Sequence, residues 1–195
     1  NDIEFSNAAV LALSAGAKKL ENTIDSSGTN SSQKIKNRLI EELRENSSDP
    51  SRTSILLSAM GNTSDSKLFL QMKEFKNSDD KIVRSSLYSS VINFKDKESL
   101  DLLKNSISTE TDSEGKKKIM QTLLHRKTDT TISNKILEEM QKENDSSTRN
   151  YMIQYLVKNK DHIPDLETKL KDFLETENDE ANRELLFKSI YSNSK

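Results

Sequence analysis

The sequence predicts an all-α protein, a right-handed α-α superhelix of about five helical hairpins with an N-terminal capping helix. Three observations support this prediction. Apolar residues recur at spacings of three and four, which is typical of amphipathic helices. Strand signals are nearly absent, because Val occurs four times against 22 Leu and no stretch alternates apolar with polar residues for long. Short polar breaks that contain Asp also interrupt the helices at a regular interval, which is typical of repeat arrays.

The repeat is defined by five aspartates. They lie 31 to 34 residues apart and serve as anchors: Asp49, Asp80, Asp112, Asp145 and Asp179. The positions seven, eight and eleven residues after each anchor are apolar or aromatic in every repeat. These offsets share one face of a helix with 3.6 residues per turn. A helix with a buried face is therefore expected after each anchor.

A second amphipathic segment precedes each anchor and completes a hairpin. Its apolar residues are, for example, Leu68, Leu70 and Phe75 in the second repeat. The breaks between repeats end at Asp65, Asp96, Asp129 and Asp161, and Asp in such a break is expected to cap the helix that follows. In the last break Pro164 is expected as the first helical residue, where a missing amide costs nothing.

The chain is expected to divide at residue 32. Within residues 1–32, Ser6 to Asp25 read as one helix with an Ala-rich face, capped by Ser6, and a flexible DSSGTNSS stretch follows. This helix is expected to cover the first hairpin or to be the last helix of an upstream unit. Residues 33–195 are expected to form the array, with units at about 33–64, 65–95, 96–128, 129–160 and 161–195.

Residues 77–96, NSDDKIVRSSLYSSVINFKD, resemble the second half of a HEAT repeat. In that family the turn after the first helix contains Asp and the second helix opens with a Val-Arg pair, which here is Val83 and Arg84. Basic residues recur at the same offset of four from the anchor, at Lys116, Arg149 and Arg183. The resemblance implies an α-solenoid whose second helices line the concave side. Because the usual prolines are missing, armadillo-like or unclassified helical hairpins stay open as alternatives.

The composition argues against catalysis and against binding of metal ions, nucleic acid or membranes. Lys and Arg number 30 against 32 Asp and Glu, so the net charge of -2 gives no field to attract nucleic acid or anionic membrane. There is no Cys and there are two His, and His125 and His162 are expected in solvated breaks. No catalytic, cofactor-binding or metal-binding residue is predicted, and no cofactor. No apolar run is long enough to span a bilayer.

Compartment stays open. A soluble chain without Cys suits a mature secreted or periplasmic protein and a cytoplasmic one equally well. The first residue is Asn1, which fits a processed protein or a fragment of a longer one.

The candidate site is the inner face of the later second helices, expected on the concave side, where side chains point away from the core. It is predicted from positions six, nine, ten and thirteen after the anchors, at Lys118, Gln121, His125, Tyr151, Gln154, Tyr155 and Lys158. Two tyrosines, expected to be exposed, lie here among amide and ammonium groups, a combination enriched where proteins bind partners. A simple solvated helix face is the competing interpretation.

The leading functional hypothesis is a non-enzymatic scaffold that binds a protein or peptide partner on the concave face. A nucleic-acid or phosphate-backbone binder of the HEAT-like type is the alternative, made unlikely by the net charge. A helical accessory domain of a larger secreted or enzymatic protein is a third hypothesis. Since Leu185 lies where other repeats are mostly polar, end-on self-association through the C-terminal repeat is also expected.

Overall fold

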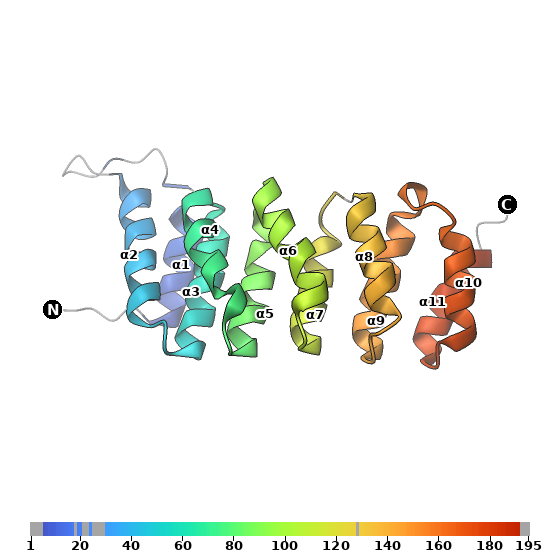
Figure 1. Ribbon diagram of the computed structural model, residues 1–195. Coiled ribbons are helices and arrows are strands. Elements are labelled where there is room, and N and C mark those ends of the chain that lie inside the picture. The colour runs from blue at the N-terminus through green and yellow to red at the C-terminus, as the bar shows by residue number, and fades with distance from the viewer. Residues whose placement is uncertain (1–5, 18, 21–23, 25–29, 128, 192–195) are drawn as a thin grey trace. The chain divides into compact units, whose positions relative to one another are not determined.

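The computed structural model describes residues 6–17, 19–20, 24, 30–127 and 129–191, and in these ranges it is all-α. Eleven α-helices lie there: α1 Asn7–Ala17, α2 Ser31–Glu45, α3 Pro50–Thr63, α4 Ser66–Met72, α5 Lys81–Ser90, α6 Lys97–Thr109, α7 Ser113–Leu123, α8 Thr130–Met140, α9 Ser146–Lys158, α10 Leu166–Thr176 and α11 Glu180–Tyr191 (Figure 1). Three short 3-10 helices join them: η1 Lys73–Asn77, η2 Val91–Asn93 and η3 Lys160–His162.

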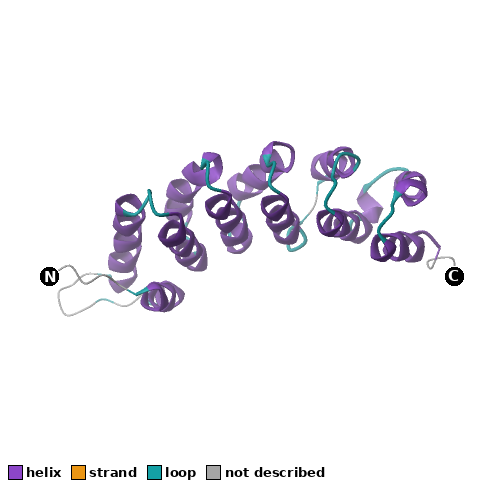
Figure 2. Ribbon diagram, turned by 90° about the horizontal axis from the view of Figure 1, so that it is seen from below, coloured by secondary structure: helices purple, strands orange, loops and turns teal. Residues whose placement is uncertain are grey.

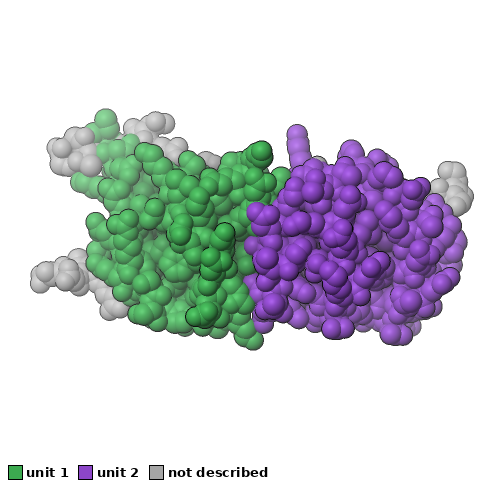
Figure 3. Space-filling model, in the orientation of Figure 1, with its two compact units in different colours: residues 1–102 green, residues 103–195 purple. Residues whose placement is uncertain are grey.

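The chain divides into two compact units, and the boundary between them in sequence lies within α6 (Figure 3). Unit 1 ends at Leu102, and unit 2 begins at Leu103. In unit 1, α1 packs on α2 and α3, and α3 packs on α5. In unit 2, α9 packs on α7, α8 and α11, and α10 packs on α11. Helices thus contact their neighbours in sequence within each unit, as a helical array requires (Figure 2).

The predicted anchors are N-caps. Each anchor carboxylate accepts a hydrogen bond from a backbone amide two or three residues ahead, at the start of α3, α5, α7, α9 and α11. Asp65, Asp96 and Asp129 cap α4, α6 and α8 in the same way. These caps satisfy amides that have no partner inside the helix, so the polar breaks fix where eight of the helices begin.

The last break was predicted incorrectly. Asp161 lies in η3, and Pro164 lies in a turn before α10 instead of inside it. Asp165, with φ 55°, enters α10 in the left-handed region and makes no side-chain cap bond. Asp is one of the few residue types besides Gly that tolerate this conformation.

The N-terminal segment also differs from its prediction. Ser6 Oγ accepts a bond from the Ala9 amide, as expected of a cap, but α1 ends at Ala17. The part of the predicted helix and of the linker at residues 18, 21–23 and 25–29 lies outside the described residues. The last two linker residues form the first turn of α2, because Asn30 caps that helix by accepting from the Gln33 amide.

The core follows the predicted offsets with two exceptions. Side chains seven and eleven residues after every anchor are buried, and so are those at offset eight in the first four repeats. Phe187, at offset eight in the last repeat, is 56% exposed, so the prediction of burial is wrong there. In α4, Leu68 is buried as predicted, but Leu70 is 43% exposed and its neighbour Phe69 is buried. Phe69 instead packs against Phe94, with ring centroids 5.2 Å apart.

Candidate functional site

The predicted partner-binding residues lie on α7, on α9 and in the turn after α7, all within unit 2. Because α7 and α9 pack against each other, their outward rows lie side by side. The Gln121 amide donates to the Tyr151 hydroxyl across this junction at 2.9 Å. We use the term α7–α9 face for Lys118, Gln121, His125, Tyr151, Gln154 and Lys158.

The other side chains of the α7–α9 face are accessible to solvent, and most of them form a hydrogen bond or an ion pair within unit 2. Lys118 Nζ lies 3.1 Å from a Glu114 carboxylate oxygen, one turn earlier in α7. Gln154 donates to the Asn150 side chain at 2.6 Å. Lys158 Nζ donates to the Leu124 carbonyl, which links the end of α9 to the end of α7. His125 is exposed in the turn that follows α7.

Tyr155 does not belong to this face, and the prediction that it is exposed is wrong. Its exposed fraction is 0%. Offset ten is buried in the first four repeats, where it is otherwise occupied by the small residues Ala59, Ser90 and Thr122. This row therefore lies in the junction between successive second helices. The small side chains at offset ten were the sequence signal that could have revealed it.

The positive charge of the face is partly neutralised. Hydrogen bonds from Lys117 and Lys118 lower the pKa of Glu114, and the bond to Glu114 raises the pKa of Lys117. Lys116 points elsewhere, because its Nζ is bonded to the buried Glu143 at 2.8 Å. The three consecutive residues Lys116, Lys117 and Lys118 therefore offer less free positive charge than the sequence indicates.

A recurring acidic residue that the sequence interpretation missed lies two residues before three of the anchors. Glu110, Glu143 and Glu177 are 4–8% exposed. One carboxylate oxygen of each accepts from the amide of the following anchor Asp at 2.9 Å. The repeated motif Glu-x-Asp was the signal available in the sequence.

Two of the basic residues that recur four positions after the anchors bind these acidic residues. Arg149 Nε and Nη2 donate to the two carboxylate oxygens of Glu177 in the next repeat at 2.8 and 2.7 Å. Its Nη1 donates to the Glu143 carbonyl at 3.0 Å. The bonds from Arg149, aided by the Asp179 amide, outweigh burial and lower the pKa of Glu177 to about 2. The pair therefore joins two successive hairpins.

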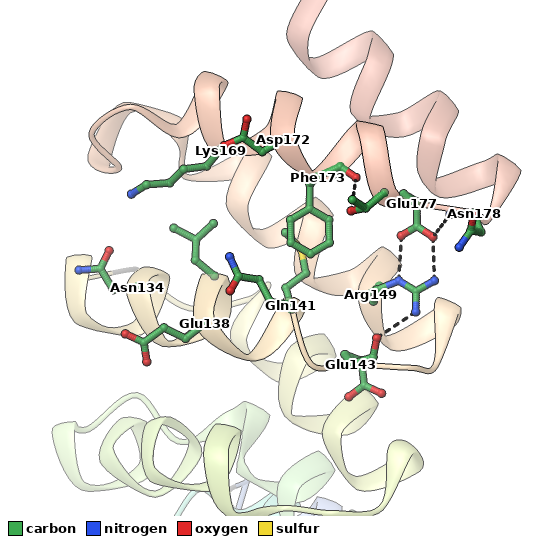
Figure 4. Close-up of a pocket in the computed structure, with 13 residues that line it drawn as sticks. Asn134, Glu138, Gln141, Glu143, Arg149, Lys169, Asp172, Phe173, Glu177 and Asn178 are labelled. Atoms are coloured by element: carbon green, nitrogen blue, oxygen red, sulfur yellow. Dashed lines mark hydrogen bonds and ion pairs between the residues drawn. The ribbon is translucent and has the colours of Figure 1, made fainter.

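The structure adds a groove of about 720 Å³ between α8 and α10. Figure 4 shows Phe173 pointing into it between Gln141 and the Arg149–Glu177 pair. Polar groups on the rim include Asn134 and Lys169. Because the three donors of Arg149 described above are already bonded, this cation offers no obvious site for an anionic substrate.

Within the described ranges there is no group of three or more His, Cys, Asp or Glu that could hold a metal ion. No helix found there is long and apolar enough to cross a bilayer. Many carboxylates pair with a basic residue one turn away in the same helix, and others, in the pairs Lys116–Glu143 and Arg149–Glu177, join successive hairpins. Compared with models of protein families, with curated proteins and with solved structures, the chain matches none of them.

Proposed function

We propose that this chain is a HEAT-like scaffold without enzymatic activity, whose α7–α9 face binds a protein or peptide partner. One observation supports this most directly. The Gln121–Tyr151 hydrogen bond joins two helices, so that an aromatic ring, amides and ammonium groups form one continuous polar surface. Tyrosine surrounded by hydrogen-bonding groups is enriched at protein interfaces.

The HEAT-like and right-handed superhelical parts of this proposal are supported by the recurrent turn chemistry. Five anchors cap second helices. The Arg side chain four residues after an anchor donates to the carbonyl two residues before it in three repeats, through Arg84, Arg149 and Arg183. Such a side chain ties the turn between two helices to the second helix, as the Asp-Arg ladder of that family implies.

An extended segment with carbonyl or carboxylate acceptors is the partner that suits this face. Lys118 and Lys158 are donors on α7 and α9, and Gln154 offers an amide between them in sequence. The balanced net charge disfavours a nucleic-acid backbone, which needs several free cations.

Affinity capture with the intact chain tests the proposal. We expect the variant with Lys118→Glu, Tyr151→Ala and Lys158→Glu to lose partners that the wild-type chain retains. A matched control changes Ser58 and Ser86 to Glu, because these residues lie at offsets nine and six of α3 and α5 in unit 1. Circular dichroism establishes that both variants are folded.

Two results would count against the proposal. One is that the α7–α9 variant retains every partner of the wild-type chain while the protein remains folded. The other is binding to oligonucleotides that weakens steeply between low and physiological salt, which would favour the nucleic-acid alternative. Equal loss in the control variant would show that the effect is not specific to this face.

A further inference from the structure

We propose that the outer face of the α10–α11 hairpin is a self-association surface, through which two copies of the chain contact each other about a two-fold axis. We define this aromatic face by Phe187 and Tyr191 of α11, with Lys171 of α10 beside them. The proposal concerns a different surface from the α7–α9 face and does not depend on it.

The strongest evidence is a difference between equivalent positions. Offset eight is occupied in the first four repeats by Leu57, Tyr88, Met120 and Ile153. None of these side chains is more than 2% exposed. Phe187 at the same offset is 56% exposed. A position used for packing between helices in the rest of the chain is thus left uncovered by the described residues of α11 and its neighbours. The aromatic face continues the apolar row that forms the interfaces inside both units.

A second aromatic side chain enlarges the uncovered area. Tyr191 is 49% exposed, and its ring centroid lies 4.7 Å from that of Phe187. Lys171 Nζ lies 5.9 Å from the Tyr191 ring centroid, within the range of a cation–π contact. Exposed aromatic clusters with a polar rim are typical of protein interfaces.

The charges around the aromatic face suit a second copy of the same chain. Lys171 pairs with Glu167 at 2.7 Å on α10, and Lys188 pairs with Glu184 on α11. Each pair is neutral, and each helix presents both signs. In a two-fold contact, residue i of one copy meets residue j of the other and the reverse, so such pairs can exchange partners without a net repulsion.

Contact between like faces closes into a dimer, whereas head-to-tail stacking leaves one face of every terminal copy open. A head-to-tail contact requires a complementary surface on the first hairpin, but α1 covers that hairpin by packing on α2 and α3. The exposed residues of α1 are mostly small or polar, such as Asn7, Ala8 and Ala12, and Leu13 is 39% exposed. A groove of about 310 Å³ between α1 and α2, lined in part by the apolar Val10, Leu13 and Ile35, is the surface there that suits an aromatic side chain. Head-to-tail stacking is therefore the competing arrangement, which the labelling experiment below separates from the two-fold contact.

Sedimentation velocity over a wide range of concentrations tests the proposal on the full chain. We expect a dimer that forms with rising concentration, and we expect Phe187→Glu to raise its dissociation constant by at least about tenfold. The matched control is Ile82→Glu, since Ile82 is an apolar residue of α5 with 54% exposure and lies outside the face. Because both side chains are exposed, both variants should keep the wild-type melting curve. A chain that stays monomeric at all concentrations, or a dimer that Phe187→Glu does not weaken, would overturn the proposal.

The two-fold arrangement has its own test, made simple because the chain has no Cys. Copies labelled at Glu180→Cys, one with a donor dye and one with an acceptor dye, should show energy transfer when mixed. Transfer between Ala12→Cys and Glu180→Cys copies should be weaker. The opposite order would demonstrate head-to-tail stacking and overturn the two-fold contact.

Discussion

The junctions between second helices differ between the two units in the balance of close packing and side-chain bridges. In unit 1, α3 and α5 approach closely, and a Cβ atom at Gly61 would lie 2.6 Å from the Ser90 carbonyl oxygen. The surrounding hydroxyls, such as Ser58 and Ser89, donate to carbonyls of their own helices. One side chain crosses this junction, since Asn93 in η2 donates to the Gly61 carbonyl at 3.2 Å. In unit 2, side chains bridge every such junction: Gln121 binds Tyr151, and Asn182 donates to the Ser146 carbonyl at 3.0 Å.

This comparison shows that one repeat period can be held together by two kinds of chemistry. Unit 1 depends on small residues that let backbones approach, so added volume should be its weak point. Unit 2 depends on buried polar and ionic contacts, so loss of a partner or a change of pH should be its weak point. The predictions below test that division.

The largest effect is expected from Arg149→Met in unit 2. The substitution leaves the Glu177 carboxylate, whose side chain is 0% exposed, without its cation. We expect a loss of about 3 to 5 kcal/mol in the free energy of unfolding, measured by urea denaturation. Adding Glu177→Gln to this variant should recover part of the loss. A loss below about 1 kcal/mol, typical of a surface pair, would contradict the assignment of this pair as a buried junction.

Acid should weaken the same junction. Because the hydrogen bonds from Arg149 lower the pKa of Glu177 from 4.5 to about 2, folding stabilises the ionised form. The resulting stability is fully present above pH 4.5 and is lost as the pH falls towards 2, amounting to about 3 kcal/mol. Urea denaturation at a series of pH values should show this slope in the wild-type chain and a flatter one in Glu177→Gln.

Unit 1 supplies the comparison for that experiment. Burial opposes ionisation of Glu42, but the bond from Arg52 and the charge of Arg38 outweigh it and lower the pKa of Glu42 as well. Peptide-level hydrogen exchange should nevertheless show unit 2 losing protection first as the pH falls below 4.5, because the large lowering of the Glu177 pKa makes protonation of this group cost unit 2 the most stability. Equal loss of protection in the two units would remove the proposed difference between them.

The smallest effect is expected from Gly61→Ala in unit 1. The new methyl group would clash with backbone and side-chain atoms of Ser90, so we expect a loss of about 1 to 3 kcal/mol in urea denaturation. Gly16→Ala is the control, because nothing lies within 4 Å of its added Cβ atom and Ala is the better helix former. If both variants are equally stable, close approach is not what holds α3 against α5.

The sequence predicted where the helices begin better than it predicted which of their side chains are buried. Helix starts depend on local caps such as Asp49 and Asp145, so a single residue type at a regular spacing revealed them. Exposure depends on what packs from outside the helix, which periodicity does not contain. Tyr155 and Phe187 show this in opposite directions, one buried in a junction and the other uncovered.

The candidate site was predicted in part for the same reason. Gln121 and Tyr151 could be placed on adjacent helices from their offsets, and the structure brings them into hydrogen-bond contact. The groove between α8 and α10 could not be predicted, because its volume depends on how far apart two helices lie. Half-buried Phe173 reads in sequence as an ordinary core residue.

The Glu-x-Asp turn has a consequence for how such a chain changes length during evolution. In unit 2, Lys116 and Arg149, four residues after their anchors, bind Glu143 and Glu177, two residues before the next anchors. A segment excised or duplicated between equivalent turns, such as the 33 residues from Asp112 to Asn144, brings one half of this contact at each edge. Recombination at these turns preserves the ion pair between successive hairpins without compensating substitutions. The number of hairpins can therefore vary while the contact that joins them stays the same.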